Sequence, residues 1–210
     1  ADRIHRQGHT VSGSDRSHDQ GKNPEKFRLF QESGIQLYPQ NGSGVGQGVE
    51  CVVVSSAIET KIPDVQAAIA QNIPIIKRAE LLAELFNSKQ GIGIAGTSGK
   101  TTTTGMTGWV LHAMGLNPTI ANGGVMQNFI GHKDSLMGNA VSGCDLFVAE
   151  MDESDGSIAL FTPVIAVLNN ITLDHKPFEV IEPLFHDFVT QAKEAAIVNL
   201  DDERAARMAS

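Results

Sequence analysis

The residues most suited to chemistry lie at positions 91–108, GIGIAGTSGKTTTTGMTG, where two glycines, a lysine and four threonines follow a short apolar run. A strict P-loop, G-x-x-x-x-G-K-[ST], would require glycine at position 94, which is Ile94, so this loop is a shortened variant. Glycines let backbone N–H groups turn inward around a triphosphate at a helix N-terminus. The candidate nucleotide-binding residues are Gly96, Thr97, Ser98, Gly99, Lys100, Thr101 and Thr102.

In this loop Lys100 is predicted to reach the β- and γ-phosphates, and the hydroxyl of Thr101 or Thr102 to bind Mg²⁺. The alternative is a glycine-rich turn between a strand and a helix that holds no ligand. The order G-K-T-T between an apolar strand and an amphipathic helix favours the phosphate site.

Polar residues follow two further apolar runs. LFVAEMDESDGS leads into four carboxylates, Glu150, Asp152, Glu153 and Asp155. Clustered carboxylates repel one another, so they indicate a cation, with Glu150 nearest the strand and best placed to bind it. A solvated acidic turn is the alternative. VIAVLNNITLDHK leads through Asn169 and Asn170 to Asp174 and His175. A lone histidine is usually structural, but Thr, Glu and His at three strand ends predict one shared metal and phosphate site.

The elements that must position these residues alternate between strand and helix. In the first half, strands are predicted near residues 9–15, 50–58 and 72–76, and helices at residues 1–7, 24–33, 63–69 and 79–86. In the second half, strands are predicted at residues 91–95, 119–121, 146–149, 164–168 and 196–198. Helices there are predicted at residues 100–114, with an apolar stripe from Met106 to Met114, and at residues 180–192.

This β–α order predicts an α/β fold of two parallel-sheet domains, residues 1–88 and 89–210, with active sites at the carboxyl ends of the strands. The charge is uneven. The first 88 residues have nine Lys and Arg against ten Asp and Glu, whereas the remainder has seven against fourteen. No basic stripe exists, which argues against nucleic-acid binding. No apolar run is long enough to cross a membrane and no signal peptide is visible, so a cytoplasmic protein is expected, with Cys51 and Cys144 as buried thiols.

Taken together, the motifs resemble the ATP-dependent Mur ligases of peptidoglycan synthesis. The motifs that carry the resemblance are AGTSGKTTTT at 95–104, ANGG at 121–124, AEMDESD at 149–155, NITLDH at 170–175, VSGSD at 11–15, VVVSSAI at 52–58 and IPIIKRAELLAEL at 73–85. The resemblance implies a Rossmann-like N-terminal domain that binds a UDP-sugar and a P-loop-type central ATPase domain. It also leads us to expect that the first strand, the end of the central domain and a C-terminal domain lie outside this chain, which alone would not ligate.

The resemblance also implies a role for each matching residue. Gly96, Gly99, Lys100 and Thr101 would hold ATP and a first Mg²⁺, which Glu150 would also bind, and His175 would bind a second Mg²⁺. Uridine contacts would come from Asp15, Ser55 and Ser56, and sugar-nucleotide pyrophosphate contacts from Asn122, Gly123 and Gly124. The substrates would be UDP-N-acetylmuramate and an amino acid, joined through an acyl phosphate.

Within the family the motifs are most similar to the alanine-adding members. Those usually have histidine where Ser98 stands, so other acceptors stay open: a muropeptide-recycling tripeptide ligase, or a polyglutamate- or cyanophycin-type synthetase. A nucleotide-binding module without ligase activity is a further alternative. Many relatives also carry a carbamylated lysine after the D-H motif. No lysine lies between Pro177 and Gln191, and His186 lies near that position.

Overall fold

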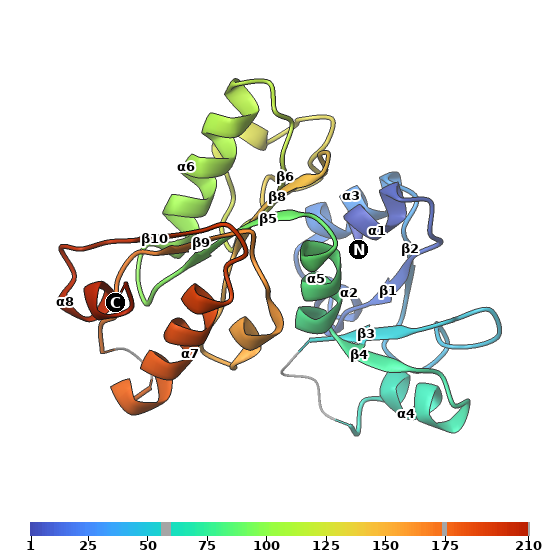
Figure 1. Cartoon of the computed structure of the whole chain (residues 1–210). Helices are drawn as coiled ribbons and strands as arrows, with labels where there is room; N and C mark the ends of the chain where they lie inside the picture. Colours follow the sequence, from blue (N-terminus) through green and yellow to red (C-terminus); the bar gives the residue numbers. More distant parts are fainter. Residues whose placement is uncertain (56–59, 174–175, 210) are drawn as a thin grey trace. The chain divides into compact units, whose positions relative to one another are not determined.

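The computed structural model describes residues 1–55, 60–173 and 176–209, and the chain forms two compact units, Ala1–Leu81 and Leu82–Ser210. Helices and strands alternate along most of the chain (Figure 1). Both units contain parallel strand pairs, which confirms the predicted α/β class with parallel sheets. Each unit is described below by itself.

The first unit contains two small parallel sheets, in which β1 pairs with β2 and β3 pairs with β4. Its strands are β1 (Ser12–Ser14), β2 (Gln36–Tyr38), β3 (Val52–Val54) and β4 (Ile75–Lys77), and its helices are α1 (Asp2–Arg6), α2 (Arg16–Asp19), α3 (Pro24–Glu32) and α4 (Pro63–Ala70). The strand at 36–38 and the helix at 16–19 were not predicted. The strand predicted near residues 50–58 reads from its apolar run as a fully buried one, which is wrong for β3, because a two-stranded sheet covers β3 incompletely and Val53 is 45% exposed.

The second unit is built on one six-stranded sheet with the order β10-β9-β5-β8-β6-β7. Its strands are β5 (Gln90–Ala95), β6 (Thr119–Ala121), β7 (Ala140–Val141), β8 (Leu146–Glu150), β9 (Ile165–Leu168) and β10 (Ala195–Val198). Its helices are α6 (Lys100–Ala113), α7 (Phe178–Thr190), α8 (Glu203–Arg207) and the short 3-10 helices η1 (Gln127–Phe129) and η2 (Ser157–Leu160), and α5 (Arg78–Asn87) spans the boundary between the units. All pairings are parallel except that of β6 with β7.

Two glycines in β5 allow aromatic side chains to pack directly on the centre of this sheet. A Cβ atom at Gly91 would lie 2.4 Å from Cζ of Phe86, and one at Gly93 would lie 2.8 Å from Cζ of Phe188. Phe86 comes from α5 and Phe188 from α7, and both are buried. The glycines of GIGIA therefore serve the packing of the strand, while α6 covers the opposite face of the sheet (Figure 1).

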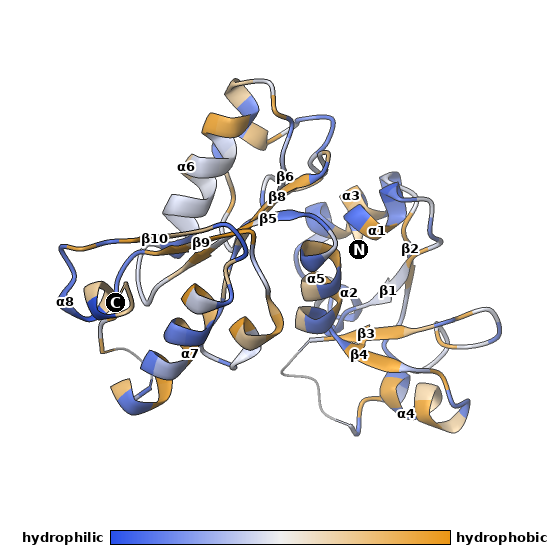
Figure 2. Ribbon diagram, viewed as in Figure 1, coloured by the Kyte–Doolittle hydropathy of each residue, from blue (hydrophilic) through white to orange (hydrophobic). Residues whose placement is uncertain are grey.

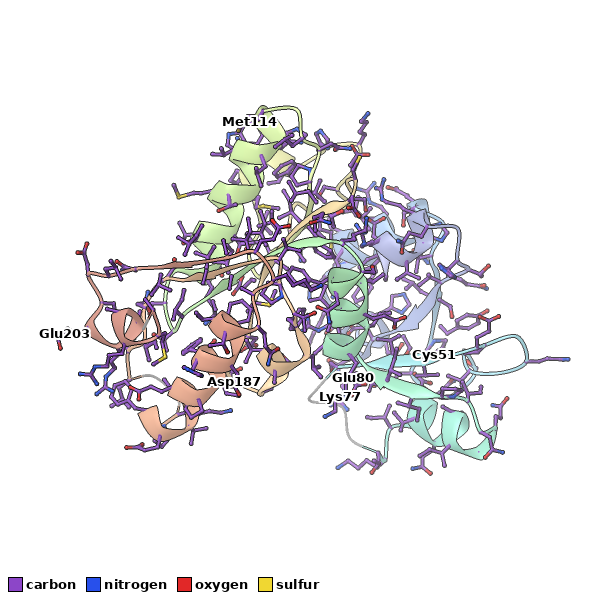
Figure 3. The ribbon with its side chains drawn as sticks, in the orientation of Figure 1. Cys51, Lys77, Glu80, Met114, Asp187 and Glu203 are labelled. Atoms are coloured by element: carbon purple, nitrogen blue, oxygen red, sulfur yellow. The ribbon has the colours of Figure 1, made fainter. Side chains whose placement is uncertain are left out.

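Helix α6 forms where it was predicted, but its apolar stripe faces solvent. Met106, Val110 and Met114 are 65%, 54% and 68% exposed, whereas Thr104 and Gly108 are the residues buried against the sheet. Figure 2 shows the helix pale over its threonine-rich start and orange towards its end, and Figure 3 shows Met114 at that end. The apolar stripe is therefore not the face that packs on the sheet, because close approach of α6 to the sheet requires small side chains on the inner face.

The expectation of buried cysteines is also wrong, since Cys51 and Cys144 are both free and exposed. Figure 3 shows Cys51 just before β3. Among the described residues, no helix combines the length and the apolar character that crossing a membrane would demand.

Candidate functional site

The loop between β5 and α6 depends on two glycines with left-handed backbone torsions. Gly96 has φ of +135° and Gly99, the residue before α6, has φ of +79°. A side chain disfavours both torsions, which accounts for glycine at these positions. The loop thereby turns the first N–H groups of α6, which have no partner within the helix, towards the carboxyl edge of the sheet.

Lys100 begins α6 and folds back over this loop. Its Nζ donates to the carbonyl oxygens of Gly96 at 2.7 Å and Thr97 at 3.4 Å. The same Nζ lies 3.1 Å from Oε1 and 3.0 Å from Oε2 of Glu153, a carboxylate that is only 7% exposed. Lys100 therefore places a positive charge at the mouth of the loop, and the buried carboxylate of Glu153 balances it.

Thr101 and Glu150 meet at the same edge of the sheet. The Thr101 hydroxyl lies 3.1 Å from Oε1 and 3.0 Å from Oε2 of Glu150, which ends β8. The backbone N–H of Gly123, just after β6, donates to Oε2 of Glu150 at 2.9 Å. Three strand ends, those of β5, β8 and β6, thus meet around one carboxylate.

The Asn122–Gly124 turn packs closely on this group of residues. A Cβ atom at Gly124 would lie 2.9 Å from Cγ2 of Thr101, and one at Gly123 would lie 2.8 Å from Oε2 of Glu150. Oδ1 of Asn122 is buried and has no hydrogen-bond partner within the described ranges. The turn therefore leaves one acceptor oxygen unpaired beside the site.

The four consecutive threonines have different environments. Thr101 and Thr102 are both exposed, and Thr101 contacts Glu150, whereas Thr103 accepts a hydrogen bond of 2.9 Å from Nδ2 of Asn169. Thr104 is fully buried against the sheet. Only the first of them lies beside a carboxylate at the mouth of the loop, which distinguishes Thr101 from Thr102 as the candidate metal ligand.

Of the four carboxylates predicted near the cation, the structure brings two to the loop. Glu150 contacts Thr101 and Glu153 contacts Lys100. Asp152 and Asp155 instead accept backbone N–H groups two residues ahead, at 2.8 Å and 2.9 Å, and so stabilise local turns. Over residues 1–55, 60–173 and 176–209, no three His, Cys, Asp or Glu side chains are grouped closely enough to hold a metal ion by themselves.

Asn169 and Asn170, which follow β9, hold the loop from its other side. Nδ2 of Asn169 bonds the Thr103 hydroxyl, and Oδ1 of Asn170 accepts from the Ser98 N–H at 2.9 Å. The sequence showed both asparagines at a strand end, but their polar side chains gave no indication of which segment they would contact. Two predicted residues, His175 and Ser56, lie outside the described residues.

The first unit contains the remaining predicted contacts. Asp15 caps α2 by accepting the Ser17 N–H at 2.7 Å, and its other oxygen lies 3.6 Å from Nζ of Lys26. Partial burial opposes ionisation, but the Ser17 hydrogen bond and the Lys26 charge together hold the pKa of Asp15 below its usual value. Ser55 is exposed directly after β3. Asp15 thus has a local structural role whether or not it also contacts a ligand.

Two further side chains bear on the family motifs. The buried carboxylate of Asp64 accepts from the Ser14 hydroxyl and from the Gly42 N–H, so it fixes the serine beside Asp15. His186 lies on α7 with 54% of its side chain exposed, and its Nδ1 is 3.5 Å from Oδ1 of Asp187. His186 therefore has the environment of a helix-surface residue.

Known proteins share both parts of this arrangement. Residues 94–210 match the Mur ligase middle domain, and residues 1–90 match the model described as Mur ligase family, catalytic domain. The UDP-N-acetylmuramate–L-alanine ligase of Bdellovibrio bacteriovorus is 40% identical over 192 residues, which are 90% of this chain and 40% of that protein. The corresponding ligase of Aquifex aeolicus is 38% identical over an alignment that covers 96% of this chain and 43% of that protein.

Solved structures agree with these matches. The UDP-N-acetylmuramate:L-alanyl-gamma-D-glutamyl-meso-diaminopimelate ligase from Neisseria meningitides superimposes with a TM-score of 0.81 at 25% identity, over 97% of this chain and 67% of that chain. The UDP-N-acetylmuramate-alanine ligase from Thermotoga maritima shares the fold, with a TM-score of 0.82 at 22% identity, over 98% of this chain and 47% of that chain. The chain spans about two fifths of the length of the curated relatives it matches. The family models together cover nearly every residue, and the chain therefore belongs to the Mur ligase family.

Proposed function

We propose that this chain carries the ATP-binding and sugar-nucleotide-binding parts of a ligase that joins L-alanine to the carboxylate of UDP-N-acetylmuramate. The reaction would consume ATP in the cytoplasm and supply peptidoglycan synthesis. The observation that carries the proposal is the meeting of Lys100, Thr101, Glu150 and the Gly123 N–H at one edge of the six-stranded sheet, where its parallel strands β5 and β8 end. That edge is where open α/β sheets bind their ligands.

In this proposal the loop binds the triphosphate of ATP. The free N–H groups at the start of α6 would bind phosphate oxygens, and Lys100 would exchange its present contacts for the β- and γ-phosphates. The backbone that keeps those N–H groups turned inward would be that of Gly96, Thr97, Ser98 and Gly99. Because phosphoryl transfer depends mainly on positioning and charge neutralisation, this loop would supply much of the catalysis.

The residues at the site fit Mg²⁺ in the type of ligand they offer. Thr101 and Glu150 present a hydroxyl and a carboxylate to the same point, and oxygen ligands are those that Mg²⁺ prefers. Bound there, Mg²⁺ would neutralise charge on the β- and γ-phosphates. His175, which lies outside the described residues, would hold a second ion.

The chemistry would proceed in two steps. The muramate carboxylate oxygen attacks the γ-phosphorus of ATP and ADP leaves, which gives an acyl phosphate. The amine of the amino acid then attacks the acyl carbon, and inorganic phosphate leaves as the amine loses a proton. The pyrophosphate of the sugar nucleotide would be oriented by Asn122, Gly123 and Gly124. Its uridine would be contacted by Asp15, Ser55 and Ser56.

Two observations support a second candidate for the acceptor. Ser98 stands where the alanine-adding members usually have histidine, and a solved relative with a TM-score of 0.81 is named for a tripeptide acceptor. The second candidate is therefore a ligase that joins a peptide to UDP-N-acetylmuramate. The L-alanine proposal is preferred because the relatives near 40% identity carry that name.

The phosphate site is tested by titrating the chain with ATP and Mg²⁺ in a calorimeter. Hydrogen bonds to charged groups contribute about 1.5–3 kcal/mol, so Lys100→Met should weaken ATP binding roughly 10- to 150-fold. The matched control is Lys89→Met, since Lys89 lies at the opposite end of β5 and its Nζ donates to the Cys144 carbonyl at 2.8 Å. Equal affinities in the parent and Lys100→Met would contradict the phosphate site.

The substrates are tested separately. The chain should bind UDP-N-acetylmuramate, and Ser55→Ala together with Asp15→Asn should weaken that binding. For the acceptor, this chain can replace the matching segment of the Bdellovibrio bacteriovorus ligase, and phosphate release is then measured with a panel of acceptors. L-alanine should stimulate release. Stimulation by a tripeptide and not by L-alanine would favour the second candidate instead.

A further inference from the structure

Asn170 is hydrogen-bonded to the loop between β5 and α6 through both its side chain and its backbone. Its Oδ1 accepts from the Ser98 N–H and from the Thr97 hydroxyl, both at 2.9 Å, and its Nδ2 donates to the Ser98 carbonyl at 2.9 Å. Its backbone carbonyl accepts the Thr97 N–H at 3.1 Å. The amide side chain thus pairs with both the donor and the acceptor of one residue, Ser98, as a neighbouring strand would.

These bonds divide the N–H groups of the loop into two sets. The N–H groups of Thr97 and Ser98 are used by Asn170, so they are not available to an anion. The N–H groups of Lys100, Thr101 and Thr102, in the first turn of α6, precede the first intrahelical bond, which the Thr103 N–H makes to the Gly99 carbonyl. Such groups bind anions at helix N-termini. Asn170 therefore fixes which amides of the loop a phosphate can reach.

The loop between β5 and α6 is held at the end of β9 by close packing as well as by hydrogen bonds. A Cβ atom at Gly96 would lie 3.1 Å from the Asn170 carbonyl oxygen and 3.2 Å from Cβ of Asn169, so the loop is already in close contact with this strand end. Thr97 is only 8% exposed, and its hydroxyl lies 2.7 Å from that of Thr172. The loop has little room to move towards the end of β9.

We propose that Asn170 is a positioning residue for phosphate binding, an inference that rests on the proposed function of the loop. By holding both backbone groups of Ser98, Asn170 keeps the amides that follow turned towards the anion before the anion arrives. A group that is already in place costs little ordering on binding. Asn170 therefore contributes to the affinity for the triphosphate without contacting it.

The test compares Asn170→Ala with Asn199→Ala, a matched control. Nδ2 of Asn199 donates to the Asn169 carbonyl at 2.9 Å, so the control removes a bond from the same strand end but not from the loop. Three quantities are measured on the 210-residue chain. They are the exchange rates of the Thr97 and Ser98 amides without ligand, the affinities for inorganic tripolyphosphate and for ATP, and the midpoint of thermal unfolding.

In the parent chain the Ser98 amide should exchange more slowly than the Lys100 amide. Asn170→Ala should speed Ser98 exchange and weaken the binding of both ligands by about 10-fold, the effect of one or two ordinary hydrogen bonds. Asn199→Ala should change neither. Affinity is compared below the unfolding midpoint, so a loss of stability alone cannot produce the expected result.

Two outcomes would overturn the inference while leaving the proposed function intact. In one, Asn170→Ala lowers the unfolding midpoint but leaves both affinities unchanged, although Lys100→Met weakens them. In the other, Ser98 exchanges as fast in the parent as in Asn170→Ala. Failure of the proposed function has a different signature: the parent binds neither ligand and Lys100→Met changes nothing. That result would overturn this inference too.

Discussion

Gly96 and Gly99 show how two residues of one type carry different constraints within one loop. Both have left-handed torsions, with φ of +135° and +79°. A Cβ atom at Gly96 would press on the backbone of Asn170 at 3.1 Å, whereas the nearest atom to a Cβ at Gly99 is Nδ2 of Asn169 at 3.7 Å. Gly96 is therefore required by torsion and by space, and Gly99 by torsion alone.

This difference predicts unequal costs for the same substitution. Strained torsions cost about 1–3 kcal/mol, and Gly96→Ala adds a backbone contact to that strain, so it should destabilise the second unit more than Gly99→Ala. Urea unfolding of both variants measures the free energy of unfolding. Equal losses in the two variants would show that crowding at Gly96 is relieved by movement of the loop.

Sequence reasoning found residues of this site but, for a physical reason, did not find all of their partners. Lys100, Thr101 and Glu150 could be predicted because their positions after strands, together with their chemistry, indicate phosphate and Mg²⁺. Glu153 pairs with Lys100, which lies 53 positions earlier in the sequence. Asn170 pairs with Ser98, which lies 72 positions earlier. Such pairs depend on strand order, which the sequence alone does not specify.

At the level of the element, α6 shows the limit of periodicity. The spacing of apolar residues predicted the helix correctly, but the apolar stripe is not the buried face, because the helix approaches the sheet through Thr104 and Gly108. A Cβ atom at Gly108 would lie 2.6 Å from Cδ1 and 3.0 Å from Cγ1 of Ile120, which is 1% exposed. Small residues at these positions set the depth at which α6, and hence the loop at its start, lies on the sheet.

Two glycines of α6 give a matched test of this packing. Alanine improves helix propensity by about 1 kcal/mol at either position. At Gly108 the added methyl overpacks Ile120, which costs about 1–3 kcal/mol, so Gly108→Ala should lower the free energy of unfolding. At Gly105 the nearest atom to the new Cβ is 3.4 Å away, so Gly105→Ala should be neutral or stabilising. Chemical denaturation of both variants measures the difference, and equal stability would contradict this account.

At the level of the whole molecule, the part of α5 from Leu82 onward packs in the core of the second unit. The units divide at Leu81 and Leu82, inside α5, and Phe86 is fully buried among the core residues of the second unit. Its ring lies 5.4 Å from that of Phe147 and 5.5 Å from that of Phe161, measured between centroids. The α/β class followed from the sequence, but the division of α5 between the units required the packing itself.

Shortened chains test where the second unit begins. A chain of residues 78–210, which keeps α5, should unfold cooperatively and bind tripolyphosphate as the whole chain does. A chain of residues 89–210 lacks Phe86 and should be unstable, because loss of a buried Phe side chain costs about 3–5 kcal/mol. The control is Phe86→Ala in the longer piece, which should reproduce most of the loss. Stable folding of residues 89–210 would mean that α5 is dispensable.

The contacts of Lys100 have a thermodynamic consequence for any anion that reaches the loop. An ammonium group has three protons, and Gly96, Thr97 and Glu153 provide three acceptors for them. An incoming anion must therefore displace an acceptor, and binding becomes an exchange whose free energy is the difference between two sets of contacts. A singly charged anion such as chloride gains little from that exchange, whereas a triphosphate brings enough charge to drive it.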